Sequence, residues 1–327
     1  MEAKKAIQFL RLVTSHLRPY LLSREDMITW GYVVDIPEGP GGDKPSEEGG
    51  VMKCERCKQP KQVRRMEEAE ECVYHWGRLF TKKVNGRHSK VGMTRLHLLI
   101  LPFTGEKVRQ YTCCSALSTS EDGCVRGPHV FYESDPMDLH KRHAFTHTRP
   151  PDTSRPVKTL EVAALDCEMI YTTGGMRVAR VSVVDGDGKE VFDEYVKMDE
   201  GVHVMLVSFL LLCFLSVLIT TLRACRDYNT RFSGITPELY STSALQPLED
   251  IRRSLDELIS SETILIGHAL ENDLKTLRMI HLRNVDTAVI FQHPAGPPYR
   301  RALRDLYASV PPIMELRPWG CDLIHFL

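Results

Sequence analysis

The sequence lacks a secretory signal, an internal repeat and any appreciable net charge. Its 42 Lys and Arg nearly balance 43 Asp and Glu, for a formal net charge of −1, so the chain is not basic overall. Lys4 and Lys5 precede an apolar stretch, but Arg11, His16 and Arg18 interrupt it and no small-residue cleavage site follows. We therefore expect an intracellular chain whose thiols are reduced.

The composition is that of a soluble globular protein, with 43% hydrophobic and 26% charged residues. A length of 327 residues is sufficient for two domains with cores of their own. The charge is unevenly spread, because residues 53–109 contain 14 Lys and Arg against 6 Glu and no Asp. With the interleaved aromatic residues, this segment suits a polyanion such as single-stranded RNA, although a solvated basic surface would look the same.

Changes in composition divide the chain into four parts. We expect a helical leader over 1–45, a Cys/His-rich module over 46–135, a Pro- and His-rich linker over 136–158, and a larger domain over 159–327. The larger domain should be an α/β fold with a mixed sheet and flanking helices, because three hairpin-linked strands precede alternating helices and strands. The expected strands are 162–166, 178–184, 191–196, 263–266 and 285–290, and the expected helices 248–259, 270–280 and 300–307.

Three acidic residues form a candidate metal site. Asp166 and Glu168 end an apolar strand, and residues i and i+2 of a strand point to the same face. Two such carboxylates repel each other unless a divalent ion such as Mg²⁺ or Mn²⁺ lies between them. Asp273 follows the strand 263–266 in the first turns of a helix, where it can face Asp166 and Glu168. The alternatives are solvated charges at a strand end and an acid that complements a helix dipole.

Several motifs together resemble the RNA exonuclease 1-like branch of the DEDDh exonucleases. The resemblance covers most of residues 50–307 and is broken once. It rests on the segments Ala164-Leu165-Asp166-Cys167-Glu168-Met169, Asp227-Tyr228-Asn229-Thr230-Arg231-Phe232-Ser233-Gly234-Ile235-Thr236, 264–274, Val285-Asp286-Thr287, Pro298-Tyr299-Arg300-Arg301-Ala302-Leu303, Tyr74-His75-Trp76-Gly77-Arg78 and Tyr111-Thr112-Cys113-Cys114.

The resemblance implies an RNase H-like fold and a nuclear 3′→5′ exonuclease that acts on single-stranded RNA ends with two Mg²⁺ or Mn²⁺ ions and no small-molecule cofactor. Asp166 would bridge both ions, Glu168 would hold the ion that activates water, and Asp273 would bind the second ion. The residues that would contact nucleic acid are Met169, His268, Tyr299, Arg300 and Arg301.

The resemblance also implies a general-base His followed five residues later by a metal-binding Asp, and the sequence lacks this motif. Pro311 and Pro312 stop the expected helix beyond Leu306, and His325 has no Asp at the required spacing. Because proton transfer alone contributes roughly 10²–10⁴-fold, we expect a severely impaired nuclease. The alternative is an inactive RNA-binding or regulatory isoform.

The break in the resemblance is an apolar insert over residues 203–226. Residues 204–222 contain no charged side chain, and this length could cross a membrane. A single crossing here would place Asp166 and Glu168 on one side of the bilayer and Asp273 on the other. The interpretations that remain are a non-native insert, a membrane helix in a chain whose nuclease domain does not assemble, and a helix docked on a surface.

The Cys/His-rich module contains eight candidate zinc ligands. Cys54, Cys57, Cys72 and His75 have the number and spacing of one tetrahedral zinc site. A second set, Cys113, Cys114, Cys124 and His129, could form another. The sets could instead combine, with Cys54 and Cys57 joined by Cys114, Cys124 or His129, or the thiols could be free and buried.

Overall fold

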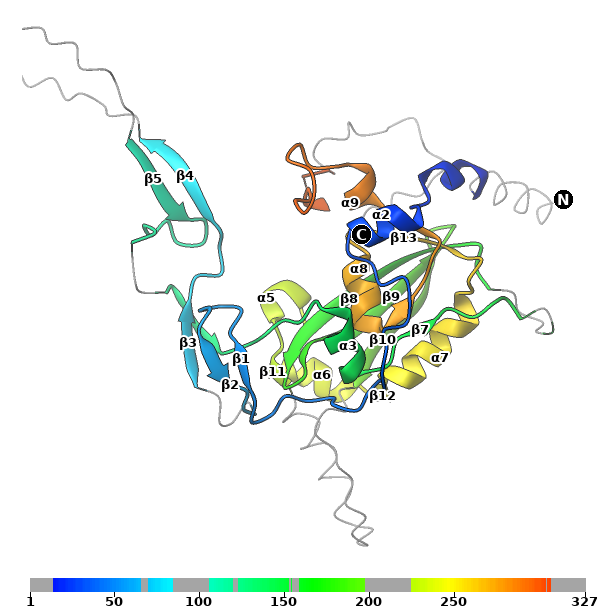
Figure 1. The fold of residues 1–327 in the computed structure, drawn as a ribbon, viewed down its shortest axis with the longest axis horizontal. Coiled ribbons are helices and arrows are strands. Elements are labelled where there is room, and N and C mark those ends of the chain that lie inside the picture. The colour runs from blue at the N-terminus through cyan, green and yellow to red at the C-terminus, as the bar shows by residue number, and fades with distance from the viewer. Residues whose placement is uncertain are drawn as a thin grey trace, which may run out of the picture.

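The computed structural model describes residues 14–65, 70–84, 106–119, 123–152, 154, 159–197, 225–303 and 305–306. Figure 1 shows a large sheet with its helices, and a smaller group of strands beside it. The predicted insert, apart from Cys225 and Arg226, lies outside the described residues, as does the sequence beyond Leu306. No helix in the described ranges is both long and apolar enough to cross a membrane.

The large domain contains a seven-stranded mixed sheet. Its order is β12-β10-β9-β8-β13-β15, with β11 paired to the end of β8. β8, β9 and β10 are antiparallel neighbours, whereas β13 runs parallel to β8 and β15 runs parallel to β13. This mixed sheet confirms the predicted α/β class. The strands are β8 (Val162–Thr172), β9 (Gly175–Asp185), β10 (Glu190–Lys197), β11 (Cys225–Asp227), β12 (Gln246–Pro247), β13 (Ile264–Gly267) and β15 (Asn284–Asp286).

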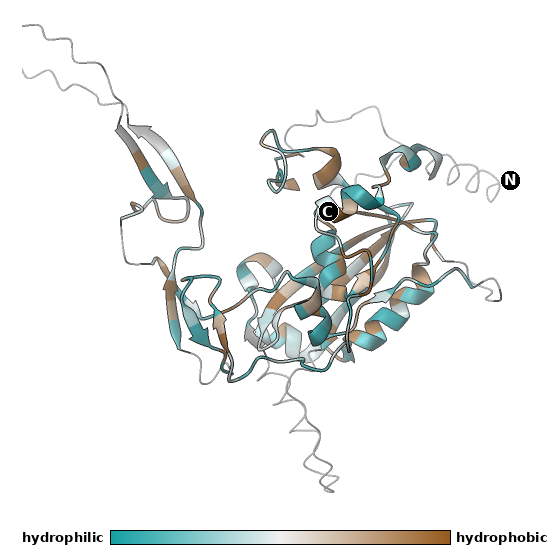
Figure 2. Ribbon diagram, in the orientation of Figure 1, coloured by the Kyte–Doolittle hydropathy of each residue, from teal (hydrophilic) through white to brown (hydrophobic). Residues whose placement is uncertain are grey.

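Burial of aliphatic side chains on both faces explains why β8 forms the middle of the sheet. Its first four residues, Val162 to Leu165, are at most 4% exposed, as is typical of a strand covered on both faces. Figure 2 shows the hydrophobic residues concentrated along the strands of this sheet.

Within the described residues, four helices lie between β10 and β15 along the chain. α7 is amphipathic, and it buries Leu248, Ile251 and Leu255 on one side. α6 and α7 lie against β10, while α8 lies across β8 and β9 (Figure 1). α8 therefore reaches the strand that carries the first two predicted acids. The four helices are α5 (Thr230–Ser233), α6 (Pro237–Ser243), α7 (Leu248–Leu258) and α8 (Glu271–Leu277).

The described part of the expected helical leader belongs to the sheet domain. Its helical elements are residues 14–17, η1 (Arg18–Tyr20) and α2 (Arg24–Thr29). The Ser23 hydroxyl accepts a hydrogen bond from the Asp26 N–H at 3.0 Å and thereby caps α2. Met27 and Trp30 are buried in the same core as β8 and β9.

The segment expected as a linker is partly structured. It contains α3 (Pro136–Arg142) and β7 (Thr146–His147), and β7 pairs in parallel with β14 (Met279–Ile280). Arg142 is 3% exposed and forms ion pairs with Glu47 at 2.7 Å and Glu133 at 2.6 Å. This part of the chain is therefore fixed to its surroundings, because buried charges need their partners.

Two other elements end earlier than the sequence predicts. The strand expected over 285–290 ends at Asp286, whose carboxylate caps α9 (Thr287–Ile290) by accepting the Ala288 N–H. α8 ends at Leu277 because Arg278 adopts a left-handed φ of 55°. Of the helix expected over 300–307, the described helical residues are 303, 305 and 306.

The Cys/His module consists of three separate two-stranded sheets. β1 (Val51–Lys53) pairs with β2 (Pro60–Gln62), β3 (Glu71–Tyr74) with β6 (Val125–Pro128), and β4 (Leu79–Val84) with β5 (Glu106–Tyr111). All three pairs are antiparallel. The described residues of the module bury few apolar side chains apart from cysteines.

Candidate active site and metal clusters

Asp166 and Glu168 lie in the central strand of the sheet. On the neighbouring strand β9, Ser182 lies opposite Asp166 and Arg180 lies opposite Glu168. The β8–β9 register shifts directly after Glu168, and such bulges redirect side chains at functional sites. Both carboxylates are half-buried, so they remain accessible to a ligand.

The structure brings Asp273 to this pair. Its side chain is 5% exposed and projects from the first turn of α8. The Asp273 Oδ1 accepts a hydrogen bond at 3.1 Å from the backbone N–H of Cys167, the residue between Asp166 and Glu168. This contact joins residues 106 positions apart and places all three predicted acids at one point of the sheet.

Burial and the Asp166 carboxylate disfavour charge on the other two acids. Burial raises the pKa of Asp166, and burial together with Asp166 raises the pKa of Glu168 to about 7. Burial and then Asp166 raise the pKa of Asp273 well above its usual range. Arg180 lies opposite Glu168 and favours its charge, but its guanidinium binds both oxygens of Asp193, at 2.7 and 2.6 Å. Crowded acids of this kind fit divalent cations.

The spacing of these acids differs from that of a single closed ion site. Among the described residues, two groups of potential ligands have donor atoms that all lie within 4.8 Å of one another. Both groups consist of Cys and His, and neither contains these carboxylates.

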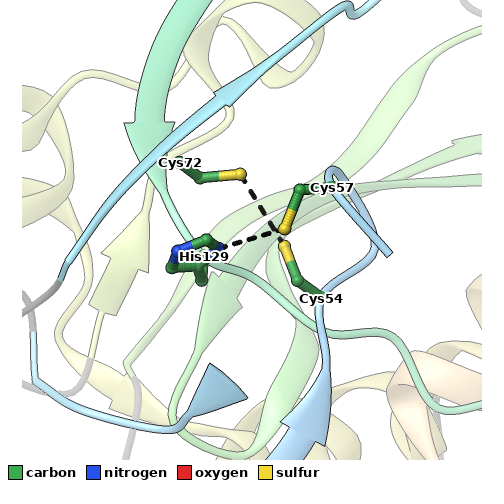
Figure 3. Close-up of side chains that lie close together, drawn as sticks. All are labelled: Cys54, Cys57, Cys72 and His129. Carbon is green, nitrogen blue, oxygen red and sulfur yellow. Dashed lines mark hydrogen bonds between the residues drawn. The ribbon is translucent and has the colours of Figure 1, made fainter. Parts of the chain in front are cut away.

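The cysteines and histidines of the module gather in two clusters. The first contains Cys54, Cys57, Cys72 and His129 (Figure 3). The second contains His75, Cys113, Cys114 and Cys124. The two predicted ligand sets were therefore wrong in one respect, because the structure places His129 in the first set and His75 in the second. The combined alternative, in which His129 joins Cys54 and Cys57, is the one that the structure shows.

The exchange follows from the antiparallel pairing of β3 with β6. Cys72 lies opposite Gly127, and Tyr74 lies opposite Val125. In this register His129 follows β6 at the end of the ladder where Cys72 lies, and Cys124 precedes β6 at the end where His75 lies. Strand pairing thus separates Cys72 from His75, although only two residues intervene in the sequence.

Comparisons with known proteins identify relatives of almost the whole chain. No family model matches the sequence. Human RNA exonuclease 1 homolog is 36% identical over 308 residues, which are 90% of this chain and 21% of that protein. RNA exonuclease 3 of Schizosaccharomyces pombe is 34% identical over 286 residues, 87% of this chain and 43% of that protein.

The chain belongs to the RNA exonuclease 1-like family. It spans less than half the length of these two relatives. Among solved structures, the Pan2 pseudoubiquitin hydrolase–RNA exonuclease module of Saccharomyces cerevisiae has a TM-score of 0.36 and 20% identity, covering 59% of this chain and 32% of that one.

His268, one of the residues that the family resemblance assigned to nucleic-acid contact, lies beside the acids. Its Nε2 lies 3.0 Å from the Arg301 carbonyl oxygen, and its Nδ1 lies 2.9 Å from the Thr287 hydroxyl. Burial lowers its pKa, although Asp286 and Asp166 act in the opposite direction. The ring is therefore fixed and favours its neutral form.

The other predicted nucleic-acid contacts lie in different environments. Met169 packs against the hydrophobic core, and Tyr299 is 61% exposed. Arg300 forms an ion pair with Glu271 and donates to the Trp30 carbonyl oxygen at 3.1 Å, so its charge is engaged within the protein. Arg301 is half-buried.

Sequence reasoning missed two charged residues near the acids. Glu271 is 4% exposed, and burial raises its pKa to about 7 despite the Arg300 guanidinium. At the sequence level it looked like any acid in a first helical turn. Arg180 was missed because its position opposite Glu168 depends on the strand register.

Proposed function

We propose that this chain is a 3′→5′ exoribonuclease domain in which Asp166, Glu168 and Asp273 hold two Mg²⁺ or Mn²⁺ ions. The observation that carries the proposal is the hydrogen bond from Cys167 to Asp273, which joins α8 to the strand segment between the other two acids. Three acids converge there with raised pKa values, so a divalent cation would relieve their repulsion.

When bound, the two ions would activate water as the nucleophile and stabilise charge on the leaving oxygen. The protein contributes a fixed position for each carboxylate. Asp166 and Glu168 are held by the β8–β9 ladder, and Asp273 is held by the Cys167 N–H. Asp166 and Glu168 lie within β8 and are only half-buried, which supports access for a phosphodiester.

The fold that we propose for the sheet domain is RNase H-like, and the substrate is the 3′ end of single-stranded RNA in the nucleus. Similarity to proteins named RNA exonuclease over 87–90% of the chain supports the reaction class. The basic segment 53–109 supports a polyanionic substrate. The exposed ring of Tyr299 is available for base stacking.

We propose a slow enzyme, because the His and Asp expected beyond Leu306 have no counterpart at the required spacing. The second candidate function is RNA binding without turnover. The lack of this His and Asp favours RNA binding without turnover, because an acidic site without a general base could still hold ions and phosphate.

The test uses the full chain and single-stranded RNA labelled at its 5′ end, with Mn²⁺ or Mg²⁺. We expect stepwise shortening from the 3′ end, and at least a 10²-fold lower rate for Asp166→Asn. Asp250→Asn, which removes an exposed acid of α7, should leave the rate unchanged. Shortening that Asp166→Asn does not slow would overturn the proposed site.

A measurement of metal binding distinguishes a slow enzyme from an incorrectly assigned metal site. Mn²⁺ titration followed by electron paramagnetic resonance should show tight binding to the wild-type chain and at least tenfold weaker binding to Asp273→Asn. Binding of Mn²⁺ and RNA with no shortening after prolonged incubation would favour the second candidate function. Equal Mn²⁺ binding by both proteins would contradict the acidic ion site itself.

A further inference from the structure

We infer that the Cys/His module binds two zinc ions at independent sites. Each site takes its histidine from the part of the sequence that supplies the cysteines of the other site. The first site consists of Cys54, Cys57, Cys72 and His129 (Figure 3). The second consists of His75, Cys113, Cys114 and Cys124. This inference concerns a part of the chain remote in sequence from the three acids and does not depend on the proposed nuclease activity.

The distances in the first site match a zinc tetrahedron. Bonds of about 2.3 Å to sulfur and about 2.0–2.1 Å to nitrogen give edges of about 3.8 Å between two sulfur atoms and about 3.5 Å between sulfur and nitrogen. The sulfur atoms of Cys54 and Cys72 are 3.9 Å apart, and the Cys57 sulfur is 3.5 Å from His129 Nδ1. The four donor atoms therefore surround a space of the size that zinc requires.

The second site has the same edge lengths. The Cys113 sulfur lies 3.8 Å from Cys114 and 3.5 Å from Cys124. His75 Nδ1 lies 3.4 Å from the Cys114 sulfur and 3.8 Å from the Cys113 sulfur. The His75 ring is stacked on Tyr111 at a centroid distance of 3.7 Å, which fixes its orientation. The adjacent Cys113 and Cys114 can therefore both face one ion.

Close backbone approaches hold the second site together. A Cβ at Gly77 would lie 2.4 Å from the Cys113 backbone nitrogen, and one at Gly123 would lie 2.2 Å from the Tyr74 backbone nitrogen. Both distances are too short for any other residue. Two glycines beside the ligands thus allow the chain segments to meet at the cluster.

Zinc fits these donors better than the alternatives. The sulfur atoms of the pairs Cys54–Cys72, Cys113–Cys114 and Cys113–Cys124 are 3.5–3.9 Å apart, against about 2.05 Å in a disulfide, and all six module cysteines are free. Three thiolates and one imidazole form a common closed tetrahedral zinc set. Hard ions such as Mg²⁺ prefer oxygen ligands instead.

The first site is connected to the proposed catalytic strand through Arg56, which lies between Cys54 and Cys57. Arg56 donates to the Pro128 carbonyl oxygen at 2.8 Å and forms an ion pair with Asp227 of β11. Its guanidinium also lies 5.7 Å from the ring centroid of Tyr171, a residue of β8. An ion in the first site therefore fixes Arg56 between the module and the sheet domain.

The first measurement is the zinc content of the purified full chain by native mass spectrometry. We expect two zinc ions per chain, and one after Cys57→Ser. In the Cys57→Ser background, His75→Ala should remove the remaining ion, whereas His129→Ala should leave it bound. The sequence-neighbour arrangement predicts the opposite result for these two double variants.

A second set of double variants, made in the Cys113→Ser chain, controls for zinc loss that is caused by misfolding. With Cys113→Ser, His129→Ala should remove the remaining ion and His75→Ala should leave it. His147→Ala, an exposed histidine of β7, should retain both ions. The inference is overturned if the chain holds fewer than two zinc ions, or if either histidine substitution removes the remaining ion in both backgrounds.

Discussion

Around β8 the chain buries a continuous set of aliphatic side chains, whereas around β3 and β6 it brings eight potential metal ligands together and buries little else. The described apolar side chains buried between 46 and 135 are Val63, Val130 and Phe131, apart from cysteines. The sheet domain can therefore be stabilised by the hydrophobic effect, whereas the described residues of the module bury too few apolar side chains for that. Its strand pairs need cross-links, which the two clusters would provide.

The two regions also use ionisable groups differently. In the module, thiols and imidazoles converge at tetrahedral distances. At the proposed active site, burial and Asp166 raise the pKa values of Glu168 and Asp273, and the three carboxylates are not part of such a compact group. A closed arrangement suits a permanently bound structural ion, and an open one suits ions that also bind a substrate.

The strongest test of this contrast is removal of zinc from the full chain with a chelator. Structural zinc contributes apparent binding energies of about 10–16 kcal/mol in small modules, so β3 and β6 should lose their protection against hydrogen exchange. Amides of β8 and β13 should stay protected, because an aliphatic core holds them. Equal loss of protection in both regions would show that they do not differ in this way.

A second test addresses the segment that joins the two regions. Arg142→Met would leave Glu47 and Glu133 without their buried partner, and should lower the free energy of unfolding by about 3–5 kcal/mol. Chemical denaturation measures this change. The neighbouring variant Lys141→Met removes an exposed cation and should leave the free energy of unfolding nearly unchanged. Similar effects of the two variants would argue against the buried ion pairs.

The third test concerns the pH dependence of the acidic site without metal. Burial and Asp166 raise the pKa of Glu168 from 4.5 to about 7. A raised carboxyl pKa contributes stability that is complete below pH 4.5 and is lost as the pH rises to about 7. Glu168→Gln should therefore stabilise the metal-free chain at pH 8 by about 1–2 kcal/mol, a value reduced for the partial exposure of Glu168.

Thermal unfolding across this pH range, with and without Mn²⁺, provides the measurement. Mn²⁺ should stabilise the wild-type chain at pH 8 more than it stabilises Glu168→Gln. Glu190→Gln, at an exposed position of β10, serves as the control and should follow the wild-type curve. A wild-type stability that rises between pH 4.5 and 7 relative to Glu168→Gln would contradict the expected sign.

The smallest expected effect concerns Tyr32, which follows α2 and contacts Asp286 of the sheet domain. The Tyr32 hydroxyl donates to Asp286 Oδ2 at 2.6 Å in a buried location. Asp286 also accepts N–H groups from Ala269, Leu270 and Ala288, so Tyr32→Phe should cost only about 1–2 kcal/mol. Denaturant titration, with the exposed Tyr20→Phe as a neutral control, checks this value.

Much of the sheet domain could be predicted because its signals are local. Apolar runs and hairpin turns indicated β8, β9 and β10, and the spacing of Asp166 and Glu168 placed both on one face. The end of the strand at Asp286 could not be predicted in this way, because it depends on a side-chain cap within an apolar segment. The packing of α3 and β7 was also hidden, since their partners lie far away in the sequence.

The α/β class, the family, and the residue types of the acids and of the candidate metal ligands can be read from the sequence, because residue type and short spacing are enough to indicate them. Which of these residues meet depends on the tertiary structure. The pairing of β3 with β6 assigned His129 to Cys72 and His75 to Cys124, and the packing of α8 on β8 brought Asp273 to the Cys167 N–H. Register and helix docking depend on contacts between distant segments, which no local pattern specifies.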